Sequence, residues 1–247
     1  MTKVCVIVGG AQGIGRATIS LLRNAYDEIA VLDYDEQALK TLQDVTTFCV
    51  DIRKRNDVQR TIDTIEREIG EIVALAHIAG VLEVGDLLTC TEDAWNRLFD
   101  TNVKGVFHTT TAVGRYMKQR EEGAIVVVGS NAASTPRLDI GAYGASKAAV
   151  IRYCQSLGLE LAPYHIRCNI VSPGSTRTQM QTGMWHDDTG EKSVIEGNLA
   201  RYKVGIPLQK IAEPEDIAQV ISFLLSSKAN HVTMANIVVD GGATLGV

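Results

Sequence analysis

The sequence predicts an α/β fold in which helices cover both faces of a parallel sheet. Short apolar runs rich in valine and isoleucine alternate with longer helical patterns, as in a doubly wound sheet with right-handed crossovers. A glycine-rich loop follows the first run, and Asp33 ends the second. The 247 residues contain no linker, low-complexity tract or repeat, so we expect a single domain over 1–247.

Seven apolar runs predict the strands of a seven-stranded sheet. Continuous apolar runs are typical of parallel strands that are buried on both faces. The runs cover residues 4–8, 28–32, 46–50, 72–76, 124–128, 167–171 and 236–239.

Helical periodicity and a terminal glycine predict a helix within 55–70. The least regular segment, 176–205, is long for a connection between strands, and we expect it to form a substrate loop or lid.

The amino-acid composition excludes several classes of binding partner. The net charge of −5 leaves no basic footprint for nucleic acid. The five cysteines are odd in number and form no C-x-x-C pair, so we expect buried free thiols in a reducing compartment, with no disulfide frame and no metal site. The apolar N-terminal run is too short for a membrane span and lacks the form of a signal peptide. We therefore expect a cytoplasmic protein without a membrane partner.

The glycine-rich loop predicts a dinucleotide site. Gly9, Gly13 and Gly15 lie between the first strand and a helix, where small residues let the backbone approach a pyrophosphate. Gln12 and Ile14 belong to the same loop and to the predicted contacts. The alternative is an ordinary glycine-rich turn.

Two carboxylates follow the next two strands. Asp33 can accept hydrogen bonds from the ribose hydroxyls and would repel a 2′-phosphate, which favours NAD over NADP. The nearby Arg16 is interpreted as a helix-surface residue. Asp51 is placed to meet the adenine, with a helix N-cap as the alternative.

Tyr143 and Lys147 are four residues apart, so on a helix they share one face. A phenol has a pKa of ~10. A cation within ~4 Å at an effective dielectric constant of ~20 is worth roughly 4 kcal/mol, so we expect Lys147 to lower that pKa toward neutrality. The alternative is a surface pair. Ser130 follows the strand 124–128, and Asn102 lies in a predicted helix, where asparagine is unfavourable.

Together these residues resemble the short-chain dehydrogenase/reductase family. The resemblance runs essentially the whole length, through "VSPGSTRT" at 171–178 and "VVDGG" at 238–242. It implies that Tyr143 is the catalytic acid/base and that Lys147 binds the nicotinamide ribose and lowers the tyrosine pKa. It also implies that Ser130 hydrogen-bonds the reacting oxygen and that Asn102 holds a water in a proton relay.

The resemblance implies further cofactor contacts, with the nicotinamide carboxamide and a nearby phosphate held by the turn after the sixth strand. The residues are Ala79, Gly80, Pro173, Gly174, Thr176 and Thr178. The chain departs from the family at Val8, where threonine is usual, and at His77 and Ile78, which replace two asparagines. His77 either takes over a backbone hydrogen bond or is a neutral buried ring without chemistry.

Residues 130–149, 167–185 and 204–246 resemble the 2,3-dihydro-2,3-dihydroxybenzoate dehydrogenases of catechol siderophore biosynthesis. This resemblance implies NAD-dependent oxidation of a small anionic cyclic diol, after which the ketone tautomerises to 2,3-dihydroxybenzoate.

An anionic substrate calls for a cation near the reacting centre. Arg137, between Ser130 and Tyr143, can grip a carboxylate bidentately; the alternative is a loop arginine paired with Asp139. Arg177 is a second candidate. An expected mobile wall that excludes water, or else ordinary core, comprises Met180, Gln181, Met184 and Trp185. His186 is expected in a solvated loop.

The sequence leaves two other functions open. One is a different short-chain NAD(P)-dependent alcohol dehydrogenase or ketoreductase. The other is a non-catalytic dinucleotide-binding regulatory protein, although the complete set of four polar residues disfavours it. The family resemblance also implies a homotetramer built on two long helices and the C-terminal strand.

Overall fold

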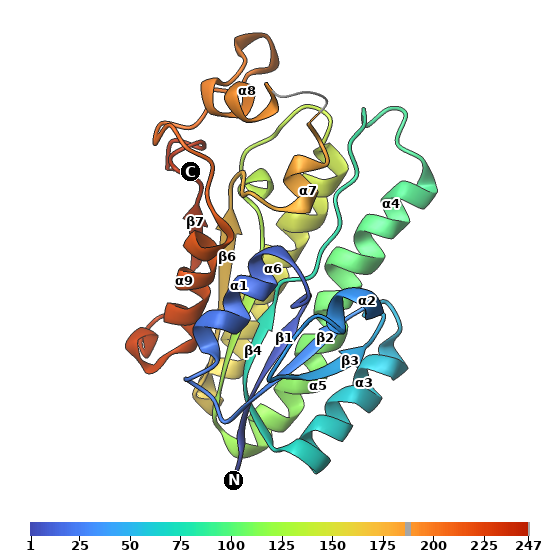
Figure 1. Ribbon diagram of the computed structural model, residues 1–247, viewed down its shortest axis with the longest axis vertical. Coiled ribbons are helices and arrows are strands. Elements are labelled where there is room, and N and C mark those ends of the chain that lie inside the picture. The colour runs from blue at the N-terminus through green and yellow to red at the C-terminus, as the bar shows by residue number, and fades with distance from the viewer. Residues whose placement is uncertain (186–188, 247) are drawn as a thin grey trace.

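The computed structural model describes residues 1–185 and 189–246 as one parallel sheet with helices on both faces (Figure 1). The strand order is β3-β2-β1-β4-β5-β6-β7. The strands are β1 Lys3–Val8, β2 Glu28–Asp33, β3 Thr46–Cys49, β4 Glu71–His77, β5 Gly123–Val128, β6 Ile166–Pro173 and β7 Asn236–Val239. All seven predicted strands are confirmed.

Side chains alternate across the strands, so each face of the sheet has its own core. On β1, Val4, Val6 and Val8 pack with helices α3, α5 and α6, whereas Cys5 and Ile7 pack with α1 and α9. The long helices are α1 Gly13–Leu22, α3 Arg55–Thr64, α5 Gly105–Arg120, α6 Gly141–Leu161 and α9 Pro214–Leu225. The predicted helix within 55–70 is present, and it ends in a π-helical turn, η1 Ile65–Ile69.

A second π-helical turn interrupts a longer helix. Helix α4 Glu92–Leu98 continues through η2 Phe99–Lys104 into α5. Such turns often mark functional sites, because they insert a residue and change the direction of its side chain. The turn at 99–104 contains Asn102.

The shorter elements are α2 Glu36–Leu39, η3 Asn131–Ala133, η4 Ala162–Tyr164, α7 Gln179–Thr182, α8 Gly190–Glu196, η5 Leu199–Arg201 and η6 Ser227–Ala229. Three of them lie within 176–205. This segment is therefore more regular than expected, and a bridge between Asn198 and Lys203 closes its last turn.

Strand order fixes the position of the site. The chain reverses direction across the sheet between β1 and β4, and ligands bind beyond the carboxyl ends of the strands at such a point. The loops after β1, β4, β5 and β6 therefore meet at one edge of the sheet.

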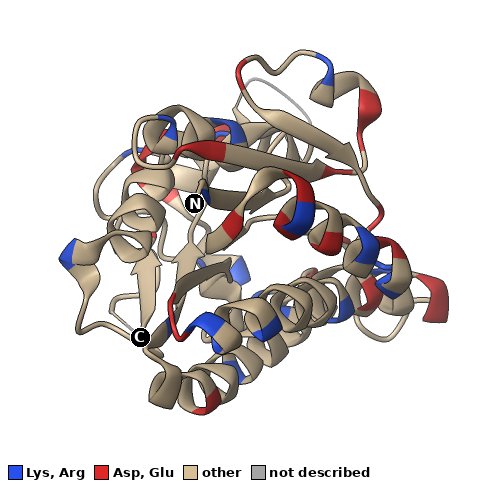
Figure 2. Ribbon diagram, turned by 90° about the horizontal axis from the view of Figure 1, so that it is seen from below, with Lys and Arg blue, Asp and Glu red and all other residues tan. Residues whose placement is uncertain are grey.

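All five cysteines are free, as expected, but two of them are not buried. Cys49 is exposed because β3 is the edge strand, and Cys90 is half-buried in the loop before α4. No helix in the described ranges is long and apolar enough to cross a membrane. Figure 2 shows acidic and basic residues interspersed along the elements.

Candidate active site

A cavity of about 1010 Å³ opens at the carboxyl ends of the strands. Its wall contains most of the predicted site residues: Gly9, Gln12, Gly13, Ile14, Asp33, Asp51, Ala79, Gly80, Ser130, Arg137, Tyr143, Lys147, Pro173, Gly174, Thr176, Thr178, Met180, Gln181 and Met184. Gly15, Asn102 and Trp185 lie outside this wall.

The glycine loop forms a cradle that side chains would fill. Gly9 has φ +79°, and a Cβ there would lie 2.6 Å from the Ala79 backbone. A Cβ on Gly13 would lie 3.1 Å from Thr178 Cγ2, and one on Gly15 would lie 2.0 Å from the Gly9 carbonyl oxygen. Gly15 therefore allows the helix to pack closely, whereas Gly13 keeps open the space beside the start of α1. The cradle fits a pyrophosphate at a helix N-terminus.

The two carboxylates on the cavity wall have different partners. Asp33 accepts hydrogen bonds from the backbone N–H of Ala11 and of Asp35, both at 3.1 Å. Asp51 instead pairs with Arg53 at 2.8 Å, and this contact lowers the pKa of Asp51. The N-cap alternative for Asp51 is wrong, because Lys54 is the N-cap of α3.

Helix α6 carries the pair four residues apart, as predicted. Lys147 Nζ lies 5.9 Å from the centroid of the Tyr143 ring and donates to the Val128 carbonyl at 2.9 Å. Ser130, which follows β5, hydrogen-bonds with the Tyr143 phenol. The structure thus brings Ser130, Tyr143 and Lys147 together.

The expected lowering of the tyrosine pKa by Lys147 is wrong for this state of the protein. Burial raises the pKa of Tyr143, and the hydrogen bond with Ser130 opposes that shift. Burial also lowers the pKa of Lys147 to about 8, since the ammonium is only 3% exposed. Lys147 is not among the groups that shift the pKa of Tyr143, and its ammonium donates to the Val128 carbonyl.

Asn102 is fully buried behind the cavity wall. Its Oδ1 accepts from the Val81 N–H at 2.8 Å, and its Nδ2 donates to the Val81 carbonyl and to Ser146 Oγ, both at 3.0 Å. Ser146 Oγ in turn donates to the Tyr143 carbonyl at 2.7 Å. Sequence reasoning missed Ser146, although its place beside Lys147 was a signal. The water relay through Asn102 remains a prediction.

His77 is fully buried, as the second alternative expects, and a backbone hydrogen bond with Ala79 agrees with the first. Its Nδ1 lies 2.8 Å from the Thr109 hydroxyl. Burial, followed by the charge of Lys147, lowers the pKa of His77 to about 3, and a backbone contact with Ala79 partly opposes the shift. His77 therefore carries no charge at neutral pH.

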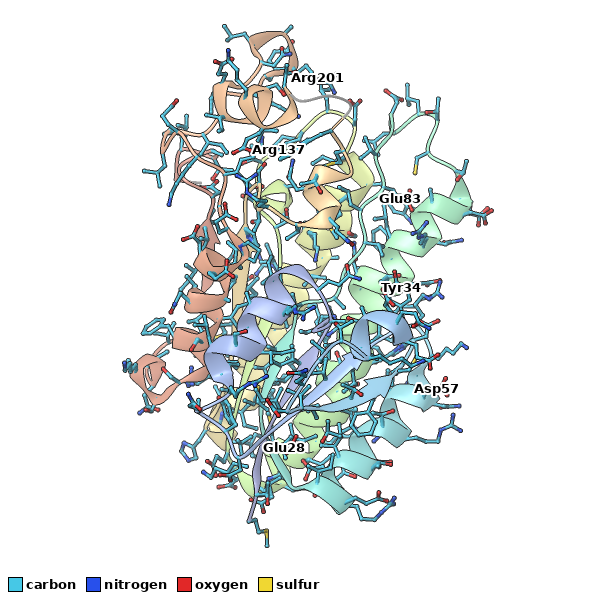
Figure 3. All side chains as sticks on the ribbon, in the orientation of Figure 1. Glu28, Tyr34, Asp57, Glu83, Arg137 and Arg201 are labelled. Atoms are coloured by element: carbon cyan, nitrogen blue, oxygen red, sulfur yellow. The ribbon has the colours of Figure 1, made fainter. Side chains whose placement is uncertain are left out.

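The substrate end of the cavity contains Arg137. This guanidinium forms no hydrogen bond or ion pair within the part of the chain that the structure describes. The alternative pairing with Asp139 is wrong, because Asp139 pairs with Arg201. Burial lowers the pKa of Arg137, and the charge of Asp240 opposes the shift. In Figure 3, Arg137 and Arg201 lie at the same end of the molecule.

Arg177 is not available to a substrate. Glu191 accepts two hydrogen bonds from it, at 2.9 and 2.7 Å, and Glu213 accepts a third at 2.9 Å. Arg177 also lies outside the cavity wall. The interpretation of Arg16 as a surface residue is confirmed, since it is exposed and bonds to Thr41.

The expected mobile wall of Met180, Gln181, Met184 and Trp185 is only partly present, because Trp185 does not line the main cavity. Trp185 lines a second cavity of about 330 Å³, which shares Gln181, Met184, Ser193, Val194 and Lys203 with the first. His186 lies outside the described residues. Sequence reasoning missed Arg201 and Lys203, although two basic residues in the irregular segment were a signal.

Comparisons with known proteins agree with this geometry. A family model described as "Enoyl-(Acyl carrier protein) reductase" matches residues 9–244. The chain is 45% identical to 2,3-dihydro-2,3-dihydroxybenzoate dehydrogenase of Bacillus subtilis (strain 168), covering 99% of this chain and 97% of that protein. It is 39% identical to the dehydrogenase of the same name from Escherichia coli (strain K12), covering 97% and 96%.

The fold also matches a solved structure, that of gox2181, with a TM-score of 0.90 and 29% identity, covering 99% of this chain and 96% of that one. The chain therefore belongs to the short-chain dehydrogenase/reductase family, whose members use a nicotinamide dinucleotide.

Proposed function

We propose that this protein oxidises 2,3-dihydro-2,3-dihydroxybenzoate to 2,3-dihydroxybenzoate with NAD. The observation that carries the proposal is the unpaired Arg137 in the cavity that also contains Ser130, Tyr143 and Lys147. A half-buried guanidinium without a carboxylate partner among the described residues suits an anionic ring. The names of the two curated relatives support the same substrate.

When bound, NAD supplies the hydride acceptor. Tyr143 takes the proton of the substrate hydroxyl as the C–H and O–H bonds break and the C=O bond forms. Ser130 holds the reacting oxygen and the phenol in one hydrogen-bonded group. Lys147 binds the ribose and contributes positive charge. Asn102 and Ser146 fix the helix turn that carries Tyr143 and support a proton path to solvent.

We assign the preference for NAD over NADP to Asp33. Its carboxylate lies on the cavity wall, and backbone N–H groups hold it in place. It can accept from ribose hydroxyls, and it would repel a 2′-phosphate. Arg53 lines the same cavity but is paired with Asp51, so it offers little to that phosphate.

The test is NADH formation by the purified protein with NAD and 2,3-dihydro-2,3-dihydroxybenzoate, alongside a panel of neutral cyclic alcohols. We expect turnover of the dihydrodiol to a catechol, with NAD preferred. Turnover of neutral alcohols alone would refute the substrate and leave a different dehydrogenase of the same family. NAD binding without turnover would favour a regulatory protein.

We also propose a cytoplasmic homotetramer. Exposed apolar side chains on α5, α6 and α9 support the assembly, namely Phe107, Leu159 and Phe223. Free thiols at all five cysteines suit a reducing compartment. Light scattering coupled to size-exclusion chromatography measures the mass, and a monomer would refute the tetramer.

A further inference from the structure

The basic side chains on the cavity wall differ in their partners. Within the described chain they are Arg53, Arg97, Arg137, Lys147, Arg201 and Lys203. Four have partners: Asp51 for Arg53, Glu83 for Arg97, the Val128 carbonyl for Lys147 and Asp139 for Arg201. Arg137 and Lys203 have neither a hydrogen bond nor an ion pair from their side chains to any described residue.

The backbone around Lys203 is fixed, although its side chain has no hydrogen bond or ion pair with a described residue. The Lys203 N–H donates to the Asn198 carbonyl at 3.0 Å, and the Asn198 N–H donates to the Lys203 carbonyl at 2.8 Å. Tyr202, between the two basic residues, has φ +55° and is 89% exposed. Arg201 and Lys203 therefore line the cavity from either side of a tyrosine that is directed to solvent.

An ion pair joins this turn to the loop that carries Arg137. Arg201 pairs with Asp139, two residues after Arg137. Figure 3 shows Arg137 and Arg201 at the same end of the molecule, on the loop before α6 and the turn after α8. Two segments distant in sequence thus present cations to one cavity.

Electrostatics at this end favour an incoming anion. Burial lowers the pKa of Lys203, the charges of Arg201 and then Arg137 lower it further, and Asp139 partly opposes the shift. Two acids act on these cations: Asp139 is paired with Arg201, and Asp240 accepts hydrogen bonds from Asn131 and Thr244. A ligand carboxylate would supply the missing charge and accept hydrogen bonds from both free cations.

We propose that Lys203 is a specificity-determining residue that binds the substrate carboxylate together with Arg137. The 176–205 segment then selects a carboxylate-bearing ring over a neutral one. This inference rests on the proposed function, because it assumes that the anion in the cavity is the substrate.

The test is a binding comparison by titration calorimetry on the enzyme–NADH complex, with 2,3-dihydroxybenzoate and neutral catechol as probes. Lys203→Met should weaken binding of 2,3-dihydroxybenzoate about tenfold or more, since a charged hydrogen bond is lost. Catechol affinity and NADH affinity should stay within about twofold of wild type, because neither ligand uses the lost charge. Lys203→Arg should restore most of the affinity.

Lys192→Met is the matched control. Lys192 lies in α8 of the same segment, is exposed, and pairs with Glu196 away from the cavity wall. The Lys192→Met substitution should leave the affinities for 2,3-dihydroxybenzoate, catechol and NADH unchanged. If Arg137 and Lys203 hold the same carboxylate, the double substitution to methionine should lose less than the product of the two single losses.

The other outcomes are distinct. If the substitution weakens the binding of both probes equally, Lys203 has a structural role, and if it weakens NADH binding, Lys203 contacts the cofactor. If no affinity changes, Lys203 does not belong to the site. Each of these three results overturns the inference. A Lys203-dependent affinity for 2,3-dihydroxybenzoate in a protein that cannot oxidise the dihydrodiol would refute the proposed function and uphold Lys203 as a carboxylate ligand.

Discussion

The two ends of the cavity are built by different means. At the cofactor end, backbone geometry sets the shape: Gly9 lies against Ala79, and backbone N–H groups hold Asp33. At the substrate end, a side-chain ion pair between Arg201 and Asp139 joins distant segments, and just outside the cavity wall Arg177 does the same with two glutamates. The residues of the first kind, glycines after a strand and an acid at the end of the next strand, can be recognised from the local sequence pattern. The second depends on which charged residues meet after folding.

Tyr143 lies where the two ends meet. A substitution there should have the largest effect on turnover with the smallest effect on ligand affinity. Tyr143→Phe should lower kcat ~10³-fold or more, because the proton acceptor is removed. Titration calorimetry should show NADH and 2,3-dihydroxybenzoate affinities near those of wild type. Retained turnover would exclude Tyr143 as the acid/base.

A second substitution tests whether one side chain sets cofactor choice at the backbone-built end. Asp33→Ala should lower the ratio of kcat/KM for NAD to that for NADP by ~10- to 100-fold. The substitution removes the carboxylate that accepts hydrogen bonds from the two ribose hydroxyls of NAD and that repels the 2′-phosphate of NADP. Glu36→Ala is the control, since Glu36 is exposed and pairs with Lys40 outside the cavity wall. An unchanged ratio would assign the preference to another group.

The pH dependence of folding stability that arises from His77 tests how rigid the cofactor end is. Its pKa in the folded protein is about 3, below the usual 6.5, so between these values the unfolded chain binds a proton that the folded chain does not. Folding stability should therefore fall as pH drops, by about 2 kcal/mol between about pH 7 and about pH 5. Urea denaturation should show that this share of the loss is absent in His77→Asn. An identical loss in both proteins would mean that the ring becomes protonated without unfolding.

The ion pairs of Arg177, just outside the cavity wall, should contribute least to global stability. Arg177 and its partners are between 38% and 50% exposed, and such pairs contribute little in water. Arg177→Gln should change the free energy of unfolding by less than about 1 kcal/mol and raise KM by no more than about threefold. A larger loss of stability would show that this end is as firmly built as the other.

The same contrast explains which predictions from sequence succeeded. Seven apolar runs, the glycine loop and the Tyr143–Lys147 spacing depend on local periodicity, and the structure contains each of them. The pairing of Asp139 was wrong, and Lys203 was missed, because both depend on contacts between residues about 60 positions apart. The expected direction of the Tyr143 pKa shift was also wrong, since burial, which spacing does not reveal, raises this pKa.

The π-helical turn at Phe99–Lys104 has a consequence for sequence change in this region. Each residue of an α-helix turns the chain by ~100° and advances it by ~1.5 Å. Deleting one residue there would give a smoother helix, yet it would rotate α4 against α5 and carry Asn102 away from Val81 and Ser146. Chain length in this helix is therefore constrained as well as the identity of Asn102, so insertions and deletions should be tolerated in the loop before Thr91 and excluded between Phe99 and Lys104.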